Sequence, residues 1–571
     1  MKAASICRAL VYCGICLVGC LVGCEDLENS IGEDPYGGGK QIYGLKLLGV
    51  DPVPSHGFPG DTVVFKAEGL LDYCNPASGE YAFKFYLGES EADILSATDT
   101  TLTVVVPDEC VSSTTYMVMD NQVFYGPYFP IEGNISVDKS WKLSSDRLDG
   151  TVYGASRQFG HPENLYLVGG FTVLSSYNHL GIGHVNSKGE VTRWSWNDYD
   201  IDYGLRYTAS DLIKPYINSI SSFEDGRMLI SGMFSAFEVR NENGSLYKLK
   251  DRVNVNNIMV LNKNAYPDTT RQYAFEDAGR DNNGNPIRYQ LSRLNGGCLQ
   301  PIVRSFVTSG QQIVAVGNLT QYVCNEYASA YQDSKQVATP VADAFRMNSV
   351  GELDKDYRSL EGSSQYTGAE GGNIMDACID SYDGVVLVGD FSSFDGVPVP
   401  GIVRLDADGN VDKAFLEKMG AGPDGNVYKI SYNKTLDKMV IVGGFTEFNG
   451  LPCHKMAMLD SDGTLDEVFK AREMKGGSPN FAQILDGGKV IVSGTFSSYG
   501  GAPRLGFLIL DRDGAAQQKF NVPGAFNGQL HQVVETVTTV GSSGLLLMGD
   551  FNRFNGEKAN NVLMLEVDWE N

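Results

Sequence analysis

The most constraining feature of the sequence is an internal repeat, in which an apolar strand ending in a Gly-containing turn occurs seven times. A near-continuous apolar strand is buried on both faces, as the middle strands of a β-propeller blade are. The last three spacings between copies are 54, 51 and 55 residues, which suits one four-stranded blade. Seven copies therefore predict a seven-bladed β-propeller. The copies are YLVGGF (166–171), MLISGMF (228–234), IVAVGNL (313–319), VVLVGDF (385–391), VIVGGF (440–445), VIVSGTF (490–496) and LLLMGDF (545–551).

The two ends of the repeat region indicate how the ring closes. The final copy stops after NNVLMLEVDWEN, one strand short of its sister repeats, whereas NISVDKSWKL (134–143) resembles GNVDKAFLEK (409–418). In this alignment Val137 corresponds to Val411 and Trp141 to Phe415. We predict that the N-terminal segment completes the last blade, which removes an exposed sheet edge. Segments with helical periodicity are essentially absent, so we expect an all-β chain.

The region before the propeller divides into three further parts. Residues 1–23 carry Lys2 and Arg8 before an apolar stretch that is too short to span a bilayer, which predicts a signal peptide. Residues 24–41 are acidic and Gly-rich and should form a flexible tether. Residues 42–131 contain short alternating strands such as TVVFKAEG (62–69) and TLTVVVP (101–107), which predict a β-sandwich. The propeller is then assigned to residues 132–571.

Several of these segments resemble known families. LVGC (21–24) resembles the lipobox of bacterial lipoproteins, which implies that Cys24 is lipidated and anchors the chain in the outer membrane; Glu25 and Asp26 resemble a signal for export to the cell exterior. The region 42–131 resembles an IPT/TIG domain, an immunoglobulin-like sandwich. The pattern of VGDFSSFDG (388–396) followed by RLDADGNVDKAF (404–415) resembles the delta-60 repeat of bacterial β-propellers.

Together these features resemble surface lipoproteins of gut Bacteroidetes associated with SusC/SusD-type uptake systems. The resemblance implies that the protein binds a nutrient ligand, a glycan or a peptide, or docks on such a transporter. A purely structural accessory and a surface hydrolase that uses carboxylates stay open as alternatives. The formal net charge of −25 without a basic patch opposes nucleic-acid binding. No HExxH, GxSxG or P-loop pattern occurs, so the sequence predicts no catalytic residue, metal or cofactor.

An aromatic segment in the first half of the propeller is the candidate ligand-binding site. Aromatic faces stack on sugar rings, and neighbouring charges satisfy hydroxyl or backbone groups. The alternative is that Trp194 and Trp196 are core residues of an outer blade strand. The candidate residues within TRWSWNDYDIDYGLRY (192–207) are Trp194, Trp196, Tyr199, Tyr203, Arg206 and Tyr207.

Three further features leave alternatives open. The acidic loop from Asp406 to Glu417 alternates like a calcium loop, but Val411 stands where the loop needs Gly, so a structural turn is favoured. Cysteines within one predicted unit could form disulfides, Cys74 with Cys110 and Cys298 with Cys324, or remain buried thiols. Inserts at about 262–297 and 321–341 break the repeat spacing and are expected to emerge from one face of the ring.

Overall fold

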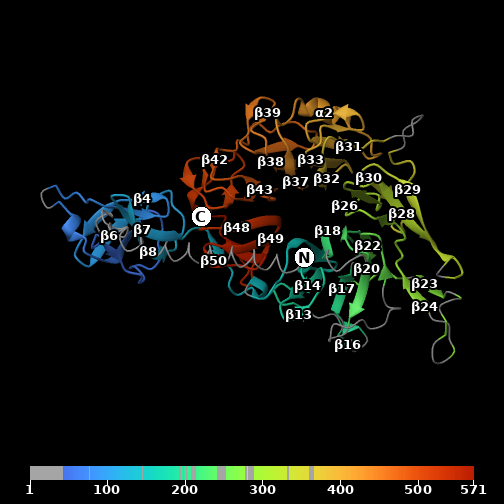
Figure 1. The fold of residues 1–571 in the computed structure, drawn as a ribbon, viewed down its shortest axis with the longest axis horizontal. Coiled ribbons are helices and arrows are strands. Elements are labelled where there is room, and N and C mark those ends of the chain that lie inside the picture. The colour runs from blue at the N-terminus through green and yellow to red at the C-terminus, as the bar shows by residue number, and fades with distance from the viewer. Residues whose placement is uncertain are drawn as a thin grey trace, which may run out of the picture.

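The chain is all-β, as predicted, with two sandwich-like sheets followed by a β-propeller (Figure 1). Within the described ranges, no helix is long and apolar enough to cross a membrane. The computed structural model describes residues 43–75, 78–144, 146–191, 195–196, 199–200, 202–206, 214–240, 253–269, 271–274, 276, 279–280, 284, 288–330, 333–358 and 366–570.

The N-terminal sandwich consists of two four-stranded sheets whose alternating apolar residues face each other. Phe65 and Phe85, one from each sheet, have ring centroids 4.9 Å apart in the core between the sheets. The first sheet has the order β1 (Lys46–Leu47), β2 (Thr62–Glu68), β6 (Thr101–Val105) and β5 (Ile94–Ala97). The second has the order β4 (Ser90–Ala92), β3 (Lys84–Leu87), β7 (Ser113–Met119) and β8 (Gln122–Phe129).

Seven antiparallel sheets in the described part of the chain form the propeller blades. In each blade the predicted apolar strand is the second strand, and its neighbours pair with it on both sides. From the first blade to the seventh, the three consecutive strands are β10 (Val152–Gln158), β11 (His161–Gly169) and β14 (Ile182–Val185); β18 (Tyr216–Ser222), β19 (Met228–Met233) and β22 (Ile258–Leu261); β26 (Arg304–Val307), β27 (Ile313–Val316) and β30 (Ala344–Met347); β32 (Ile374–Ile379), β33 (Val385–Gly389) and β36 (Ile402–Leu405); β37 (Val427–Asn433), β38 (Lys438–Gly443) and β41 (Met456–Asp460); β43 (Pro479–Ile484), β44 (Val490–Gly494) and β47 (Phe507–Leu510); and β48 (Asn527–Val537), β49 (Ser543–Phe554) and β51 (Val562–Val567).

Smaller sheets and hairpins accompany the blades. Most contain a hairpin that follows the glycine turn after the second strand of a blade. In four of them, a short strand from just before the first strand of the blade pairs with this hairpin. The three-stranded ones are β17 (Asp202–Arg206), β20 (Ala236–Arg240) and β21 (Val253–Asn254); β25 (Gly297–Cys298), β28 (Gln321–Glu326) and β29 (Lys335–Pro340); β31 (Ala369–Glu370), β34 (Ser393–Phe394) and β35 (Val397–Pro398); and β42 (Met474–Lys475), β45 (Ser498–Tyr499) and β46 (Ala502–Pro503). The two-stranded ones in this position are β12 (Val173–Leu174) with β13 (Tyr177–Asn178) and β39 (Glu447–Phe448) with β40 (Leu451–Pro452), while β50 (Glu557–Lys558) pairs with β49. Two further hairpins, β15 (Ser195–Trp196) with β16 (Tyr199–Asp200) and β23 (Arg271–Ala274) with β24 (Arg288–Leu291), follow the third strands of the first and second blades.

The glycine of the repeat lets the first and second strands of a blade approach closely. A Cβ atom on Gly389 would lie 2.0 Å from the carbonyl oxygen of Asn373, and one on Gly549 would lie 2.1 Å from that of Gln529. Any side chain at these positions would push the strands apart. The aromatic residue that follows, such as Phe391, is buried in the blade.

The predicted closure of the ring is present. The strand β9 (Ile135–Val137) pairs antiparallel with β51 of the seventh blade, with Val137 opposite Leu565. The backbone N–H of Asp138 then donates to the carbonyl oxygen of Met564 at 2.9 Å. Chain segments about 430 residues apart in sequence therefore share one sheet, in which β9 covers the outer edge of β51.

The sandwich is docked on the sixth and seventh blades, where Figure 1 shows the blue and red parts of the chain side by side. The Arg504 guanidinium, 1% exposed, pairs with the Glu109 carboxylate at 2.6 Å. The hydroxyl of Tyr128 donates to the carbonyl oxygen of Asn555 at 2.8 Å, and the Ser112 N–H donates to that of Val522 at 2.9 Å. Polar contacts thus fix the orientation of one domain on the other.

One expectation differs from the structure, and the structure adds detail to two others. Residues 413–419 form a helix, α2 (Lys413–Met419), because the Asp412 carboxylate accepts from the backbone N–H groups of Ala414 and Phe415 and so caps it; the sequence predicted no helix. Of the two alternatives left open for the cysteines, the structure has the free thiols: Cys74, Cys110, Cys298, Cys324, Cys378 and Cys453 are all unpaired. Most of the predicted insert 321–341 forms a long hairpin, in which β28 and β29 pair with each other and with β25 of a small sheet.

Candidate functional site

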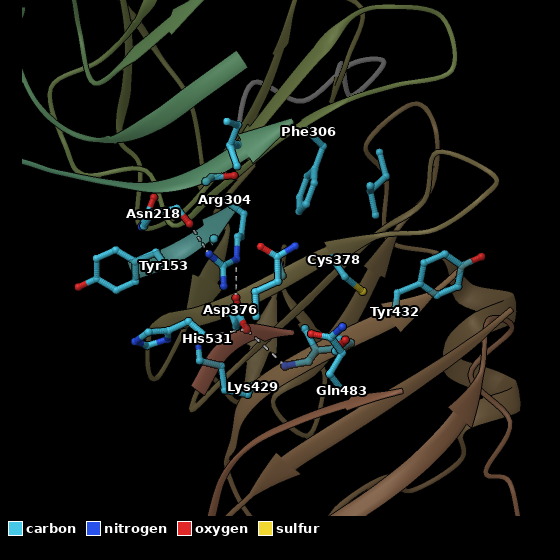
Figure 2. A pocket seen from close by; sticks show the side chains of 18 of the residues that line it. Tyr153, Asn218, Arg304, Phe306, Asp376, Cys378, Lys429, Tyr432, Gln483 and His531 are labelled. Carbon is cyan, nitrogen blue, oxygen red and sulfur yellow. Dashed lines mark hydrogen bonds and ion pairs between the residues drawn. The ribbon is translucent and has the colours of Figure 1, made fainter. Parts of the chain in front are cut away.

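A cavity of about 320 Å³ lies where the first strands of all seven blades meet (Figure 2). Its lining residues come from β10, β18, β26, β32, β37, β43 and β48, which are the innermost strands of the ring. We call this cavity the central channel. Ligand sites typically occupy about 300–1,000 Å³, so the channel is large enough for a small ligand.

A β-bulge directs side chains into the central channel. In six of the seven innermost strands, the pairing with the second strand is irregular at the same place. The irregularity comes just before the residue that lies opposite the neighbour of the repeat glycine, as Asp376 lies opposite Val388. A bulge bends a strand and changes the direction of its side chains. In the third blade, β26 begins at the equivalent residue, Arg304. The seven equivalent residues are Gly154, Ser219, Arg304, Asp376, Lys429, Phe481 and Gln532.

Three consecutive blades place charged side chains at this position. Arg304 Nε donates to Asp376 Oδ1 at 2.8 Å, and Lys429 Nζ lies 3.4 Å from Asp376 Oδ2. Arg304 Nη1 also donates to the backbone carbonyl oxygen of Asn218 at 2.6 Å, on the second blade. Figure 2 shows Arg304 and Lys429 on either side of Asp376. Two cations therefore share one carboxylate across the third, fourth and fifth blades.

The surroundings shift the pKa values of this cluster. Burial acts to raise the pKa of Asp376, but the adjacent charges of Arg304 and Lys429 offset it, and the pKa is lowered. Burial lowers the pKa of Lys429, with Asp376 opposing the shift. Burial also lowers the pKa of His531 to about 3, and the charges of Lys429 and Arg304 add to this effect. At neutral pH the His531 imidazole is uncharged.

The rest of the lining is rich in hydroxyl and amide groups. Asn218 Nδ2 donates to the carbonyl oxygen of Ile302, while its Oδ1 is buried without a hydrogen-bond partner among the described residues. Gln532 Oε1 accepts from the backbone N–H of Ala155 at 2.6 Å. Ser431 and the ring of Tyr153 also line the cavity. The channel therefore presents hydrogen-bonding groups beside the charged cluster.

The structure describes the predicted aromatic site only in part. Trp196 and Tyr199 pair as the hairpin of β15 (Ser195–Trp196) and β16 (Tyr199–Asp200). Tyr203 and Arg206 lie on β17, opposite Val239 and Ala236 of β20. Trp194 and Tyr207 lie outside the described residues, as does Cys24. The described part of the segment thus consists of one hairpin and one strand of the small sheet that accompanies the second blade.

The acidic loop that begins at Asp406 is a turn between blade strands. The Asp406 carboxylate accepts from the backbone N–H groups of Asp408 and Asn410, at 3.0 and 2.9 Å. The Asp412 carboxylate caps α2 and pairs with Arg404, so it too is engaged in the fold. Among the residues that the structure describes, no group of three or more His, Cys, Asp or Glu side chains is placed to hold a metal ion.

The channel residues could not be predicted from the repeat, because the repeat lies on the second strand of each blade and the channel is lined by the first. The second strand repeats the same residue types, whereas the seven equivalent channel positions range from Gly154 to Arg304 and Phe481. The sequence carries only an indirect signal: in three consecutive blades a charged residue, Arg304, Asp376 or Lys429, occurs two residues after an apolar one and before the repeated second strand.

Comparison with protein families identifies three regions. A domain of unknown function, DUF5008, matches residues 20–127, and another, DUF5124, matches residues 131–225. A third, the DUF5122 β-propeller, matches 383–415, 437–469 and 488–516. The chain is a protein with DUF5008, DUF5124 and DUF5122 β-propeller domains. The three DUF5122 matches fall on the fourth, fifth and sixth blades. Each match begins just before the second strand of its blade.

Solved structures that match the chain include a β-propeller. The WD40 β-propeller domain of Doa1 has 10% identity and a TM-score of 0.37, covering 76% of this chain and 98% of that one. A putative phosphatase from Bacteroides thetaiotaomicron has 9% identity and a TM-score of 0.29, covering 91% and 97%. A protein of unknown function from the same organism has 10% identity and a TM-score of 0.22, covering 94% and 99%. No curated protein matches the chain.

Proposed function

We propose that this protein is a lipid-anchored outer-membrane protein that faces the cell exterior and binds a nutrient ligand, a glycan or a peptide, in the central channel of its propeller. The observation that carries the proposal is the polar, charged cavity formed jointly by all seven innermost strands. The lipobox at Cys24 supports the anchor. The resemblance to lipoproteins associated with SusC/SusD-type transporters supports a role in uptake, with the sandwich as a spacer between membrane and propeller.

The chemistry of the cavity supports binding over hydrolysis. A glycoside hydrolase uses two carboxyl groups, one of them protonated through a raised pKa. Asp376 is the one carboxylate among the described residues that line the central channel, and its pKa is lowered by Arg304 and Lys429. An ion-paired carboxylate of this kind is a poor proton donor.

The proposal is tested on outer-membrane fractions that contain the full-length protein, with a panel of immobilised glycans and peptides. In Ser431→Trp, an indole fills the central channel, so we expect ligand retention to be lost, while Ser431→Ala as the matched control keeps it. In Cys24→Ala, we expect the protein to leave the membrane fraction, because acyl chains provide its attachment.

Two results would contradict the proposal. Equal retention of ligand by a folded Ser431→Trp variant would show that ligand binds elsewhere. Fractionation of Cys24→Ala with outer membranes at the wild-type level would show that the anchor is wrong. A thermal transition like that of the wild type establishes that the Ser431→Trp variant is folded.

A further inference from the structure

Resting on the proposed function, we propose that the central channel recognises a carboxylate-bearing saccharide, whose carboxylate is bound between Arg304 and Lys429. The proposal rests on the charge of the channel, on the donors that remain there and on the chemistry of the surrounding lining.

The charged groups of the channel do not cancel. Among the described lining residues, Arg304 and Lys429 contribute two positive charges and Asp376 one negative charge, while His531 is neutral at pH 7. The channel therefore carries an excess of one positive charge in a chain whose formal net charge is −25. Charges beyond about 8–10 Å are screened at physiological salt, so the local cluster determines which ligand charge is favoured. That charge is negative.

Both cations retain donors for a ligand. Arg304 uses Nε for Asp376 and Nη1 for the Asn218 carbonyl oxygen, which leaves Nη2 without a partner among the described residues. The Lys429 ammonium has three N–H donors and contacts Asp376 at 3.4 Å. Hydrogen bonds between a cation and a carboxylate are about twice as strong as neutral ones, so a carboxylate gains most at this position.

The remaining lining favours a saccharide over a peptide. Asn218 Oδ1 is an acceptor without a partner among the described residues, and Gln532 uses only its Oε1 on the neighbouring blade. Ser431 adds a hydroxyl group. Such groups match the hydroxyls of a sugar, while the ring of Tyr153 offers an apolar surface for a pyranose face. The open cavity of about 320 Å³ holds one or two sugar rings, so a short acidic oligosaccharide would enter it with one end.

Two substitutions that change the charge of the central channel in opposite directions provide a direct test. The protein used is residues 25–571, which keeps every residue that the structure describes, and binding is measured by calorimetry. The probes are trigalacturonate, its neutral methyl ester, and the tripeptides Ala-Glu-Ala and Ala-Gln-Ala. Lys429→Gln removes the excess positive charge, whereas Asp376→Asn adds to it. Lys489→Gln is the matched control, because Lys489 pairs with Asp511 on the sixth blade, outside the channel.

We expect trigalacturonate to bind and its methyl ester to bind at least about tenfold more weakly. Lys429→Gln should weaken trigalacturonate binding about tenfold, Asp376→Asn should strengthen it, and Lys489→Gln should leave it unchanged. Added salt should weaken binding to the wild type. The opposite effects of Lys429→Gln and Asp376→Asn cannot both arise from misfolding.

Other outcomes overturn the inference in distinguishable ways. If trigalacturonate and its methyl ester bind equally, or if Lys429→Gln and Asp376→Asn both lose affinity, the ligand carboxylate is not recognised here, although the proposed function still stands. If Ala-Glu-Ala binds and trigalacturonate does not, the ligand is not a saccharide. Failure of every probe, together with failure of the immobilised panel, removes the proposed function itself.

Discussion

Among single residues, the buried His184 makes the stability of the first blade depend on pH. Its Nε2 lies 3.0 Å from Gln158 Oε1, and its ring packs against Tyr166 with centroids 4.8 Å apart. Burial lowers the pKa of His184 to about 4, and the nearby His161 adds to the shift. The neutral imidazole is therefore part of the folded state, and protonating it opposes folding.

The pH dependence of stability follows from that shift. An unfolded histidine has a pKa of about 6.5, so the contribution of His184 is complete above this pH and is lost as pH falls towards 4. The loss amounts to about 3 kcal/mol for the 8% exposed side chain. We expect His184→Gln to lose less stability between pH 7 and pH 4 than the wild type in urea titrations. His56→Gln, at an exposed imidazole, is the control; parallel curves for all three proteins would contradict the assignment.

At the scale of elements, the ring closure repeats the geometry of an ordinary blade. Val137 faces Leu565 as Val411 faces Leu405, and the N–H of Asp138 donates to Met564 as that of Asp412 donates to Arg404. Trp141 packs against the turn glycine Gly189 of the first blade, as Phe415 packs against Gly463 of the fifth. The N-terminal segment therefore takes the place of the missing last strand, with the same neighbours.

The closure is tested by a substitution in its strand. Ser136 is exposed and lies opposite Glu566, so its side chain contributes little, but its backbone belongs to the ladder. Proline at this position removes an N–H donor and does not fit a paired strand. We expect Ser136→Pro to lower the thermal midpoint of the whole propeller and Ser136→Thr to leave it within a few degrees. If both variants melt like the wild type, β9 does not hold the ring closed.

These elements also show what the sequence could predict. The second strands were found because burial on both faces requires the same apolar residues in every blade, and the closure was found because Trp141 and Phe415 occupy equivalent core positions. The helix α2 was missed because seven residues with one cap carry little periodic signal. The channel was missed because its residues face a cavity, where no packing rule requires Arg304, Asp376 and Lys429 to resemble one another.

For the whole molecule, the sandwich and propeller share one continuous core. A single cluster of buried side chains extends from Phe65 and Phe129 in the sandwich to Phe526 and Phe554 in the last blades. Arg504 occupies the position that Val399 and Cys453 hold in other blades, and it pairs with Glu109 of the sandwich. The sixth blade thus contributes an ion pair to the docking of the sandwich, and we expect the two domains to move as one rigid unit.

A steric wedge at this junction tests that rigidity. A Cβ atom on Gly524 would lie 2.3 Å from the carbonyl oxygen of Ser112 and 2.8 Å from the Tyr128 hydroxyl, so Gly524→Val must separate the domains. We expect small-angle scattering of residues 25–571 to show a longer, more flexible particle, and the thermal midpoint to fall because the shared core is opened to water. Gly487→Val is the control, since a Cβ atom there meets nothing within 4 Å. Scattering from Gly524→Val that superimposes on the wild-type curve would show that the sandwich is not held by this contact.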